Sequence, residues 1–264
     1  MFDVVTGRRN FGRIFAGMAG VVALGGGATA AVAAVRRSSE EEEKKFRTVP
    51  WPYTKLEPDR VAMRAFEGYG KARCMYGTFE AIVGSAADRL GGPYRNFPYD
   101  VMAYGADGIG GWGTVCGALN GAAAAFQLLS REPGPLVDSL FGWYEQQPLP
   151  NVQLTSATGA PVQTISGSPL CHVSIARWCA STGLKADDPS RVERCGALVA
   201  SVARRATELL NVQAAGRALP VVPASAASQC GTCHTESDAK DDARAKMDCN
   251  GCHFHLTTDA HPKT

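Results

Sequence analysis

Two Cys-x-x-Cys-His motifs near the end of the chain carry the clearest chemistry in the sequence. Each contributes two cysteines and one histidine: Cys230, Cys233 and His234 in the first, and Cys249, Cys252 and His253 in the second. In this motif the cysteines form thioethers with the vinyl groups of a haem, and the adjoining histidine binds the iron. The sequence therefore predicts two covalently attached haems c, with His234 and His253 as their proximal ligands.

The cysteine spacing by itself leaves two other interpretations open. Without the histidines, the four motif cysteines read C-x2-C-x15-C-x2-C, which is also the spacing of a structural zinc site. A pair of plain disulfides is the third alternative. A zinc ribbon needs no histidine after its second cysteine, yet both motifs have one, and four of the five histidines lie after residue 230. We therefore favour haem.

A six-coordinate haem iron needs a second axial ligand, and three further histidines are candidates: His255, His261 and His172. Since His255 follows His253 by only two residues, it cannot easily reach the opposite face of the same ring. We expect it to bind the neighbouring haem or one in a partner subunit. For His172 the alternative is a hydrogen-bonding role. Methionine ligands also stay open: Met63, Met75, Met102 and Met247.

The N-terminal residues have the pattern of an export signal. Arg8 and Arg9 precede a weakly apolar run from 14 to 35 that is rich in Ala and Gly and contains the cleavage candidate Ala28-Thr29-Ala30. This pattern is typical of a twin-arginine signal. An uncleaved membrane anchor is the alternative, although the run is poor in Leu, Ile and Phe. We expect a periplasmic protein that contacts the membrane only if residues 1–35 are retained.

Length and composition indicate a mainly α protein with four segments. After residues 1–35, we expect a charged linker and extended arm at 36–54, a helical cysteine-containing domain at 55–222, and an irregular dihaem-binding segment at 223–264. The 264 residues suffice for one domain of moderate size. The formal net charge of +2 is too small to favour nucleic acid as a partner.

Apolar periodicity and capping residues predict several helices within 55–222. A long helix begins with Asp59 as N-cap and ends at Gly91, and Cys74 is expected to face the interior. An Ala-rich helix follows Cys116 and ends near Leu129, and another short helix begins near Pro133. We read the glycine-rich loop from 105 to 113 as backbone that approaches another group closely.

The second half of this region has one strong helical signal. Residues 147–168 indicate a loop or a small hairpin. Asp188 followed by Pro189 predicts the start of a helix, with the aspartate as N-cap. Its expected core face consists of apolar residues three or four apart: Val192, Cys195, Val199, Val202, Ala206 and Leu209.

Five cysteines lie outside the haem motifs: Cys74, Cys116, Cys171, Cys179 and Cys195. In an exported protein they could form disulfides, or act as small buried apolar residues. Three of them stand where ligands would be expected, at a glycine-rich helix start (Cys116), beside a histidine (Cys171) and on an interior helix face (Cys195). Four thiolates that converge from different helices could hold an iron–sulfur cluster.

The arrangement of these cysteines resembles a known family. Cys74, then Cys116-Gly-Ala-x-x-Gly, then Cys171 and Cys195 are similar to the redox-active proteins named for C…CGAxxG…C…C cysteines. Such a domain followed by two Cys-x-x-Cys-His motifs resembles the split-Soret cytochrome c proteins, over about residues 55 to 255. Cys179 lies outside the pattern and is the alternative to Cys171 as a ligand.

The resemblance implies a homodimer with two c-type haems per subunit, stacked near the subunit interface. It also implies bis-histidine iron, with one axial histidine lent across the dimer, and an iron–sulfur centre such as [2Fe–2S] held by the cysteines of the domain. Six-coordinate haems leave no site for a substrate, so we expect outer-sphere electron transfer with redox partner proteins. The alternative is a reductase that acts on a small molecule at a five-coordinate haem.

Overall fold

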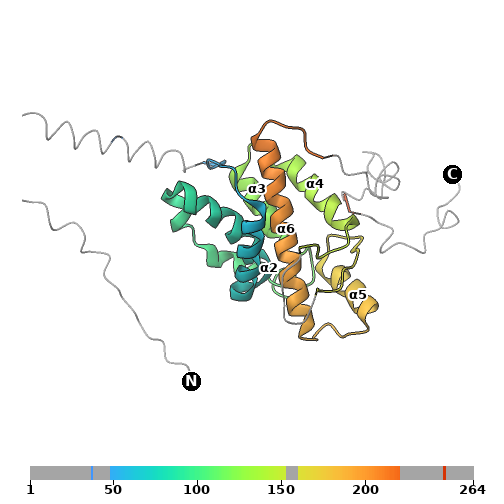
Figure 1. Ribbon diagram of the computed structural model, residues 1–264. Coiled ribbons are helices and arrows are strands. Elements are labelled where there is room, and N and C mark those ends of the chain that lie inside the picture. Colours follow the sequence, from blue (N-terminus) through green and yellow to red (C-terminus); the bar gives the residue numbers. More distant parts are fainter. Residues whose placement is uncertain (1–36, 38–47, 153–159, 221–245, 248–264) are drawn as a thin grey trace, which may run out of the picture. The chain divides into compact units, whose positions relative to one another are not determined.

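The computed structural model describes residue 37 and residues 48–152, 160–220 and 246–247 (Figure 1). The chain divides into two units, Met1–Lys44 and Lys45–Thr264. In the first unit only Arg37 is described, so the fold below is that of the second. The twin-arginine motif, both Cys-x-x-Cys-His motifs, His255 and His261 lie outside the described residues.

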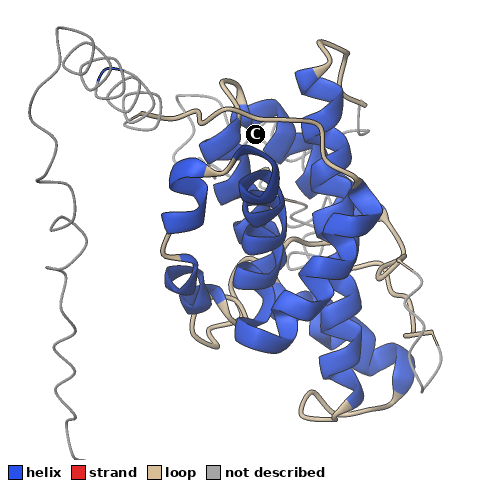
Figure 2. Ribbon diagram, turned by 60° about the vertical axis from the view of Figure 1, so that its left-hand side comes forward, coloured by secondary structure: helices blue, strands red, loops and turns tan. Residues whose placement is uncertain are grey.

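The described part of the second unit is built from helices (Figure 2). They are α2 (Pro58–Leu90), η1 (Gly92–Asn96), η2 (Tyr99–Gly105), α3 (Gly117–Leu129), α4 (Pro133–Gln146), α5 (Cys171–Thr182) and α6 (Ser190–Ala214), the two η elements being 3₁₀ helices. Extended pairing among the described residues is limited to two isolated antiparallel bridges, Val115 with Leu170 and Leu149 with Thr164. The predicted mainly α class is confirmed.

Helix α2 is two helical arms joined by a sharp reversal, which the periodicity did not predict. Ala72 and Arg73 leave the helical conformation, and Arg73 has a φ of 70°. The arms pack so closely that a Cβ on Gly68 would lie 3.0 Å from the Cα of Gly77. Cys74 is the first residue after the reversal, which sends it into the interior at 5% exposure.

Helix α6 crosses the middle of the unit and packs most extensively against α2, with α3 and α4 also in contact (Figure 1). Its apolar face supplies buried residues to the core, among them Val199, Val202 and Leu209. Burial of such side chains drives folding through removal of apolar surface from water. Val192 departs from the predicted face, because it is 41% exposed at the start of the helix.

Two predicted caps need correction. The N-cap of α2 is Glu57 with Pro58 in the first turn, so Asp59 lies inside the helix. Proline suits this place because the first helical N–H groups have no acceptor within the helix. Helix α6 starts at Ser190, and the Asp188 carboxylate accepts hydrogen bonds from the Ser190 N–H at 2.9 Å and its hydroxyl at 2.5 Å. The predicted ends of α2 and α3, at Gly91 and near Leu129, are confirmed.

The segment before α2 lies along the helical unit. The Trp51 N–H donates to the Leu128 carbonyl at 2.7 Å, and the Tyr53 hydroxyl donates to the Asn211 side chain at 2.8 Å. The Trp51 ring meets Tyr94 edge-on with centroids 5.0 Å apart. These contacts tie the N-terminal side of the unit to α3 and to the end of α6.

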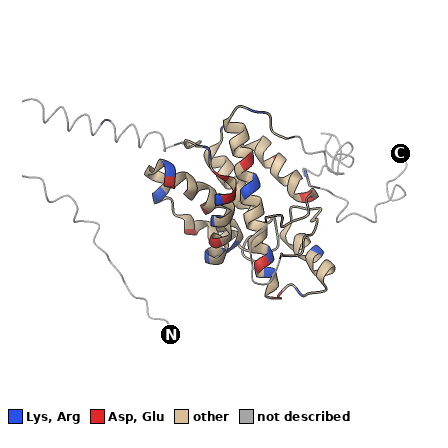
Figure 3. Ribbon diagram, in the orientation of Figure 1, with Lys and Arg blue, Asp and Glu red and all other residues tan. Residues whose placement is uncertain are grey.

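Charged residues of both signs are interspersed along α2 and α6 (Figure 3). Ion pairs such as Arg191 with Asp107 join separate elements. Within the described ranges, no helix combines the length and apolar character needed to cross a membrane.

Candidate metal centre

Four cysteines from four elements line one small cavity in the helical unit. Cys74 comes from α2, Cys116 from the start of α3, Cys171 from the start of α5 and Cys195 from α6. Three of them are almost fully buried, at 4 to 6% exposure, and Cys171 is half-buried. All four are free thiols. The fold thus brings Cys74 and Cys195, which are 121 positions apart in the sequence, to the same cavity.

Backbone pairing holds Cys116 and Cys171 beside each other. The Cys116 N–H donates to the Pro169 carbonyl at 2.8 Å, and the Cys171 N–H donates to the Thr114 carbonyl at 2.7 Å. Each cysteine begins a helix, since Cys116 is the N-cap of α3 and Cys171 the first residue of α5. Because the helix N-terminus carries partial positive charge, both helices direct a favourable field toward anionic sulfur.

The glycine-rich loop from 105 to 113 covers the other side of the cavity. Its residue Asp107 lines the space, and the Asp107 N–H donates toward the Cys74 sulfur. Asp107 and Ile109 have φ values of 49° and 60°, a conformation that costs free energy for residues with a side chain. The loop is therefore held close to the cysteines at some conformational cost, as the glycine content led us to expect.

The thiols influence one another electrostatically. Burial, followed by the neighbouring Cys116 thiol, raises the pKa of Cys171 to about 12. The same two causes raise the pKa of Cys74 well above its ordinary value. Burial also raises the pKa of Cys195, while the Arg194 guanidinium acts in the opposite direction. Without a metal, the thiols of Cys74, Cys171 and Cys195 are therefore protonated at neutral pH, and metal binding would release their protons.

The donor set fits a multi-iron cluster better than a single ion. In the described ranges, no three His, Cys, Asp or Glu side chains are grouped tightly enough to hold one metal ion. The four thiols nevertheless line one cavity, in which burial and then the neighbouring Cys116 thiol raise the pKa of both Cys74 and Cys171. An iron–sulfur cluster distributes four cysteine ligands over more than one iron, so its ligands surround a space rather than a point. The shared cavity is therefore compatible with a cluster even though no single ion would be held by these side chains.

Two further candidate ligands, Cys179 and His172, do not line this cavity. Cys179 lies two turns further along α5 and is not among the lining residues, whereas Cys171 is. His172 also does not line the cavity, and its Nδ1 lies 2.9 Å from the Gly113 carbonyl oxygen. That contact matches the hydrogen-bonding alternative for His172. It also leaves Nε2 as the ring nitrogen that could bind a metal.

Three residues at the cavity were not predicted from the sequence: Asp107, Ser174 and Arg194. Arg194 is 1% exposed and precedes Cys195 directly. The adjacency was visible in the sequence, but the helical pattern would place neighbouring residues on different faces. The burial of Arg194 therefore follows only from the tertiary structure.

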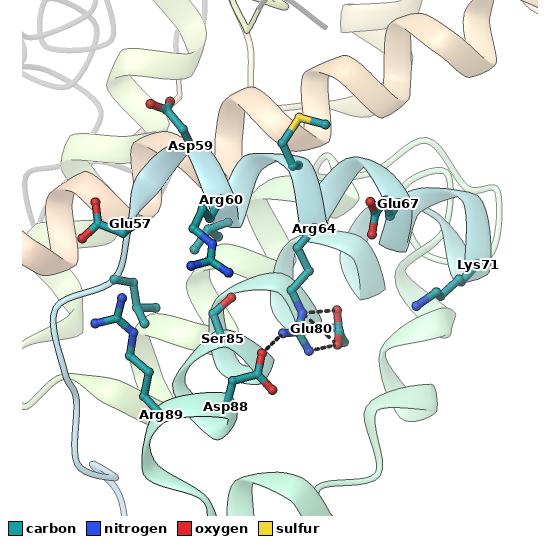
Figure 4. Close-up of a pocket in the computed structure, with 13 residues that line it drawn as sticks. Glu57, Asp59, Arg60, Arg64, Glu67, Lys71, Glu80, Ser85, Asp88 and Arg89 are labelled. Atoms are coloured by element: carbon teal, nitrogen blue, oxygen red, sulfur yellow. Dashed lines mark hydrogen bonds and ion pairs between the residues drawn. The ribbon is translucent and has the colours of Figure 1, made fainter.

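A larger surface groove, of about 700 Å³, lies elsewhere between the arms of α2 (Figure 4). Its walls are mostly charged, and Arg64 bridges the arms through ion pairs with Glu80 and Asp88. The groove contains neither cysteine nor histidine. Size alone therefore does not identify the redox site, and the cysteine cavity is the better candidate.

Comparisons with known proteins agree with this geometry. Residues 76–209 match the family model of the redox-active proteins described as C_GCAxxG_C_C. That pattern places cysteine directly before the alanine, whereas this chain has Gly117 there and Cys116 one position earlier. A Cβ at residue 117 would lie 2.3 Å from the Gly105 carbonyl oxygen and 2.8 Å from the Cys74 Cβ. In this chain a side chain at 117 would therefore clash, and the thiol is supplied by residue 116.

The chain is 38% identical over 215 residues to the split-Soret cytochrome c of Desulfovibrio desulfuricans (strain ATCC 27774), which covers 77% of each chain. It also matches a solved structure described as showing a novel iron centre in the split-Soret cytochrome c from Desulfovibrio desulfuricans ATCC 27774. The TM-score is 0.71 and the identity 34%, over 83% of this chain and 95% of that chain. The chain belongs to the split-Soret cytochrome c family and is an electron-transfer cytochrome.

Proposed function

We propose that this protein is a periplasmic dihaem c-type cytochrome that transfers electrons by an outer-sphere route, and that it holds an iron–sulfur cluster at Cys74, Cys116, Cys171 and Cys195. The observation that carries the proposal is the convergence of these four thiols on one cavity. Metal-binding cysteines are expected to converge in this way, whereas residues that only fill the core need not. The novel iron centre described for the related structure supports the presence of an iron centre in this protein as well.

The chain's own residues would bind, orient and enclose such a cluster. Two helix N-termini direct positive field at it, Asp107 closes one side, and α6 supplies both Cys195 and a buried cation. When bound, the cluster would accept and release one electron. The cavity wall is mostly buried, which limits water access and fits outer-sphere transfer better than catalysis on a substrate.

The haem part of the proposal depends on the sequence motifs. Two Cys-x-x-Cys-His motifs provide two haems c, with His234 and His253 as proximal ligands. The distal ligands would be histidines, and the candidates are His255, His261 and His172. Bis-histidine ligation favours lower haem reduction potentials than His/Met ligation does. Histidine lent by a second copy of the chain would make the protein a homodimer. The paired arginines near the N-terminus support export in the folded state.

Serine variants of the cysteines test the cluster. In the full chain produced with c-type haem maturation, we expect Cys116→Ser to lose most non-haem iron and acid-labile sulfide. The matched variant Cys179→Ser keeps both, because Cys179 does not line the cavity. Iron and sulfide are measured chemically, and haem is followed separately on a denaturing gel. Equal loss in the two variants, or no sulfide in the unmodified protein, would contradict the proposed cluster.

Visible spectroscopy tests the haems. We expect haem to remain with the denatured chain, and low-spin bands with a split Soret band in the reduced native protein. Carbon monoxide added to the reduced protein should leave these bands unchanged, because six-coordinate iron has no open position. Ready carbon monoxide binding would instead favour the reductase alternative, and a colourless zinc protein would overturn the haem assignment.

A further inference from the structure

Arg194 is a buried cation at the cysteine cavity. Its side chain is 1% exposed and lines the space together with the four thiols. Its Nη2 donates to the Ser174 hydroxyl at 2.9 Å and more weakly to the Thr164 hydroxyl at 3.4 Å. Its Nε and Nη1 are buried without a hydrogen-bond partner among the described residues. These two donors lack an oxygen or nitrogen acceptor among the described residues, and the adjacent Cys195 thiol is the group of the cavity that the guanidinium already influences.

A guanidinium in this position needs a negative partner. Burial of an unpaired charge is strongly unfavourable, so buried arginines are normally paired with an anion. None of the ion pairs formed by the described residues includes Arg194. The groups that share its cavity and can become anionic are the four thiols and Asp107.

The second cation near the cavity is already paired. Arg191 lies one turn earlier on α6, and its Nη1 is 3.2 Å from the Asp107 carboxylate. This pair neutralises Asp107 as well as Arg191. Arg194 is therefore the cation whose charge is left to act on the contents of the cavity.

We infer that Arg194 is a positioning residue that raises the reduction potential of the cluster, an inference that rests on the proposed function. Ferric iron, sulfide and four thiolates together carry a net negative charge, and reduction adds one electron without a change of bonds or protons at Arg194. A cation fixed in a poorly hydrated wall stabilises the reduced form more than the oxidised form. Hydrogen bonds and charge around an iron site are general means of setting its potential.

Three full-chain variants test the inference by a potentiometric titration with redox dyes, followed by the electron paramagnetic resonance signal of the reduced cluster. Arg194→Gln removes the charge, and we expect at least a tenfold shift toward the oxidised cluster at a fixed potential, which is about 59 mV downward for one electron. Arg194→Lys keeps the charge, and we expect its cluster potential to differ from that of the unmodified chain by less than this amount. Arg205→Gln, on the same helix but paired with Glu208 at 3.1 Å, should leave the potential unchanged.

The outcomes separate the inference from the proposed function. Absence of the cluster signal and of sulfide in the unmodified protein would refute the cluster, not the role of Arg194 relative to it. A cluster whose potential is the same in Arg194→Gln as in the unmodified chain would overturn the inference. If Arg194→Gln retains no cluster, Arg194→Lys decides: a potential near that of the unmodified chain supports a charge effect, and a tenfold shift contradicts it.

Discussion

At the scale of single residues, the site depends as much on a missing side chain as on the thiols. Gly117 follows Cys116 directly, and a Cβ there would meet the Gly105 carbonyl oxygen, the Cys74 Cβ and the Met75 nitrogen at 2.3, 2.8 and 3.1 Å. Two of these contacts are with backbone atoms, which cannot move aside cheaply. The close approach of α3 to the reversal of α2 thus requires glycine at 117.

We therefore expect Gly117→Ala to destabilise the fold and to disturb the cluster. Overpacking of this kind typically costs about 1–3 kcal/mol of the free energy of unfolding. Chemical denaturation followed by circular dichroism measures that loss. The content of non-haem iron shows whether Cys74 and Cys116 can still bind one cluster together. Gly134→Ala is the matched control, because no atom lies within 4 Å of a Cβ at 134. Equal stability of the two variants would contradict the packing argument.

At the scale of elements, the reversal within α2 decides where the first cysteine goes. The arms on either side of Ala72 and Arg73 cross at Gly68 and Gly77, and Arg64 links them through Glu80. Without this fold-back, a straight helix would carry Cys74 away from α3. The close crossing of the two arms is therefore part of what brings Cys74 to the cysteine cavity.

Gly77→Ala tests this crossing. A Cβ at 77 would lie 2.8 Å from the Tyr69 nitrogen and 2.9 Å from the Ala65 carbonyl oxygen, so the arms would have to separate. We expect a loss of about 1–3 kcal/mol in the free energy of unfolding, measured by denaturant titration. Gly70→Ala, with no atom within 4 Å of its Cβ, should instead raise stability by about 0.5–1 kcal/mol, because alanine favours the helix. A stabilised Gly77→Ala would refute the crossing.

At the scale of the whole helical unit, burial extends to the hydroxyl groups of several tyrosines. Tyr94 is fully buried, and its hydroxyl donates to the Pro52 carbonyl. Burial raises the pKa of Tyr53, Tyr94 and Tyr144 well above the ordinary tyrosine value. It also raises the pKa of Tyr99 to about 12. These phenols belong to the helices and to the arm before α2, so their ionisation affects the unit as a whole.

The raised tyrosine pKa values predict loss of stability at alkaline pH. The folded state holds these protons more tightly than the unfolded state, so the stability they contribute is complete below the ordinary pKa of about 10. It falls as pH rises from there through the folded-state values. Thermal unfolding midpoints between pH about 8 and about 12 should decline along this course. A midpoint that stays constant to pH 12 would contradict the assignment, because the same phenols ionise in the unfolded chain from about pH 10 upward.

Local patterns in the sequence determined much of this protein. The Cys-x-x-Cys-His motifs are contiguous, so the prediction of two attached haems depends only on the cysteines and the histidine within each motif. Short-range periodicity, glycine and proline also determine the mainly α class, the C-terminal ends of α2 and α3, and the start of α4 near Pro133. For α6, both the predicted N-cap and the predicted burial of Val192 were wrong in the first turn, because helix ends depend on their immediate tertiary surroundings.

The tertiary structure alone decided which distant residues meet. The reversal at Arg73 interrupts a pattern that reads as one helix, since packing of the two arms outweighs local preference. Cys171 rather than Cys179 faces the cavity because the backbone pairs residue 171 with residue 114. The burial of Arg194 beside four thiols depends on where α5 and α6 lie, and no sequence spacing encodes a contact between residues so far apart. Charge, burial and the choice between Cys171 and Cys179 at the cavity are therefore properties of the fold, while the set of candidate cysteines is a property of the sequence.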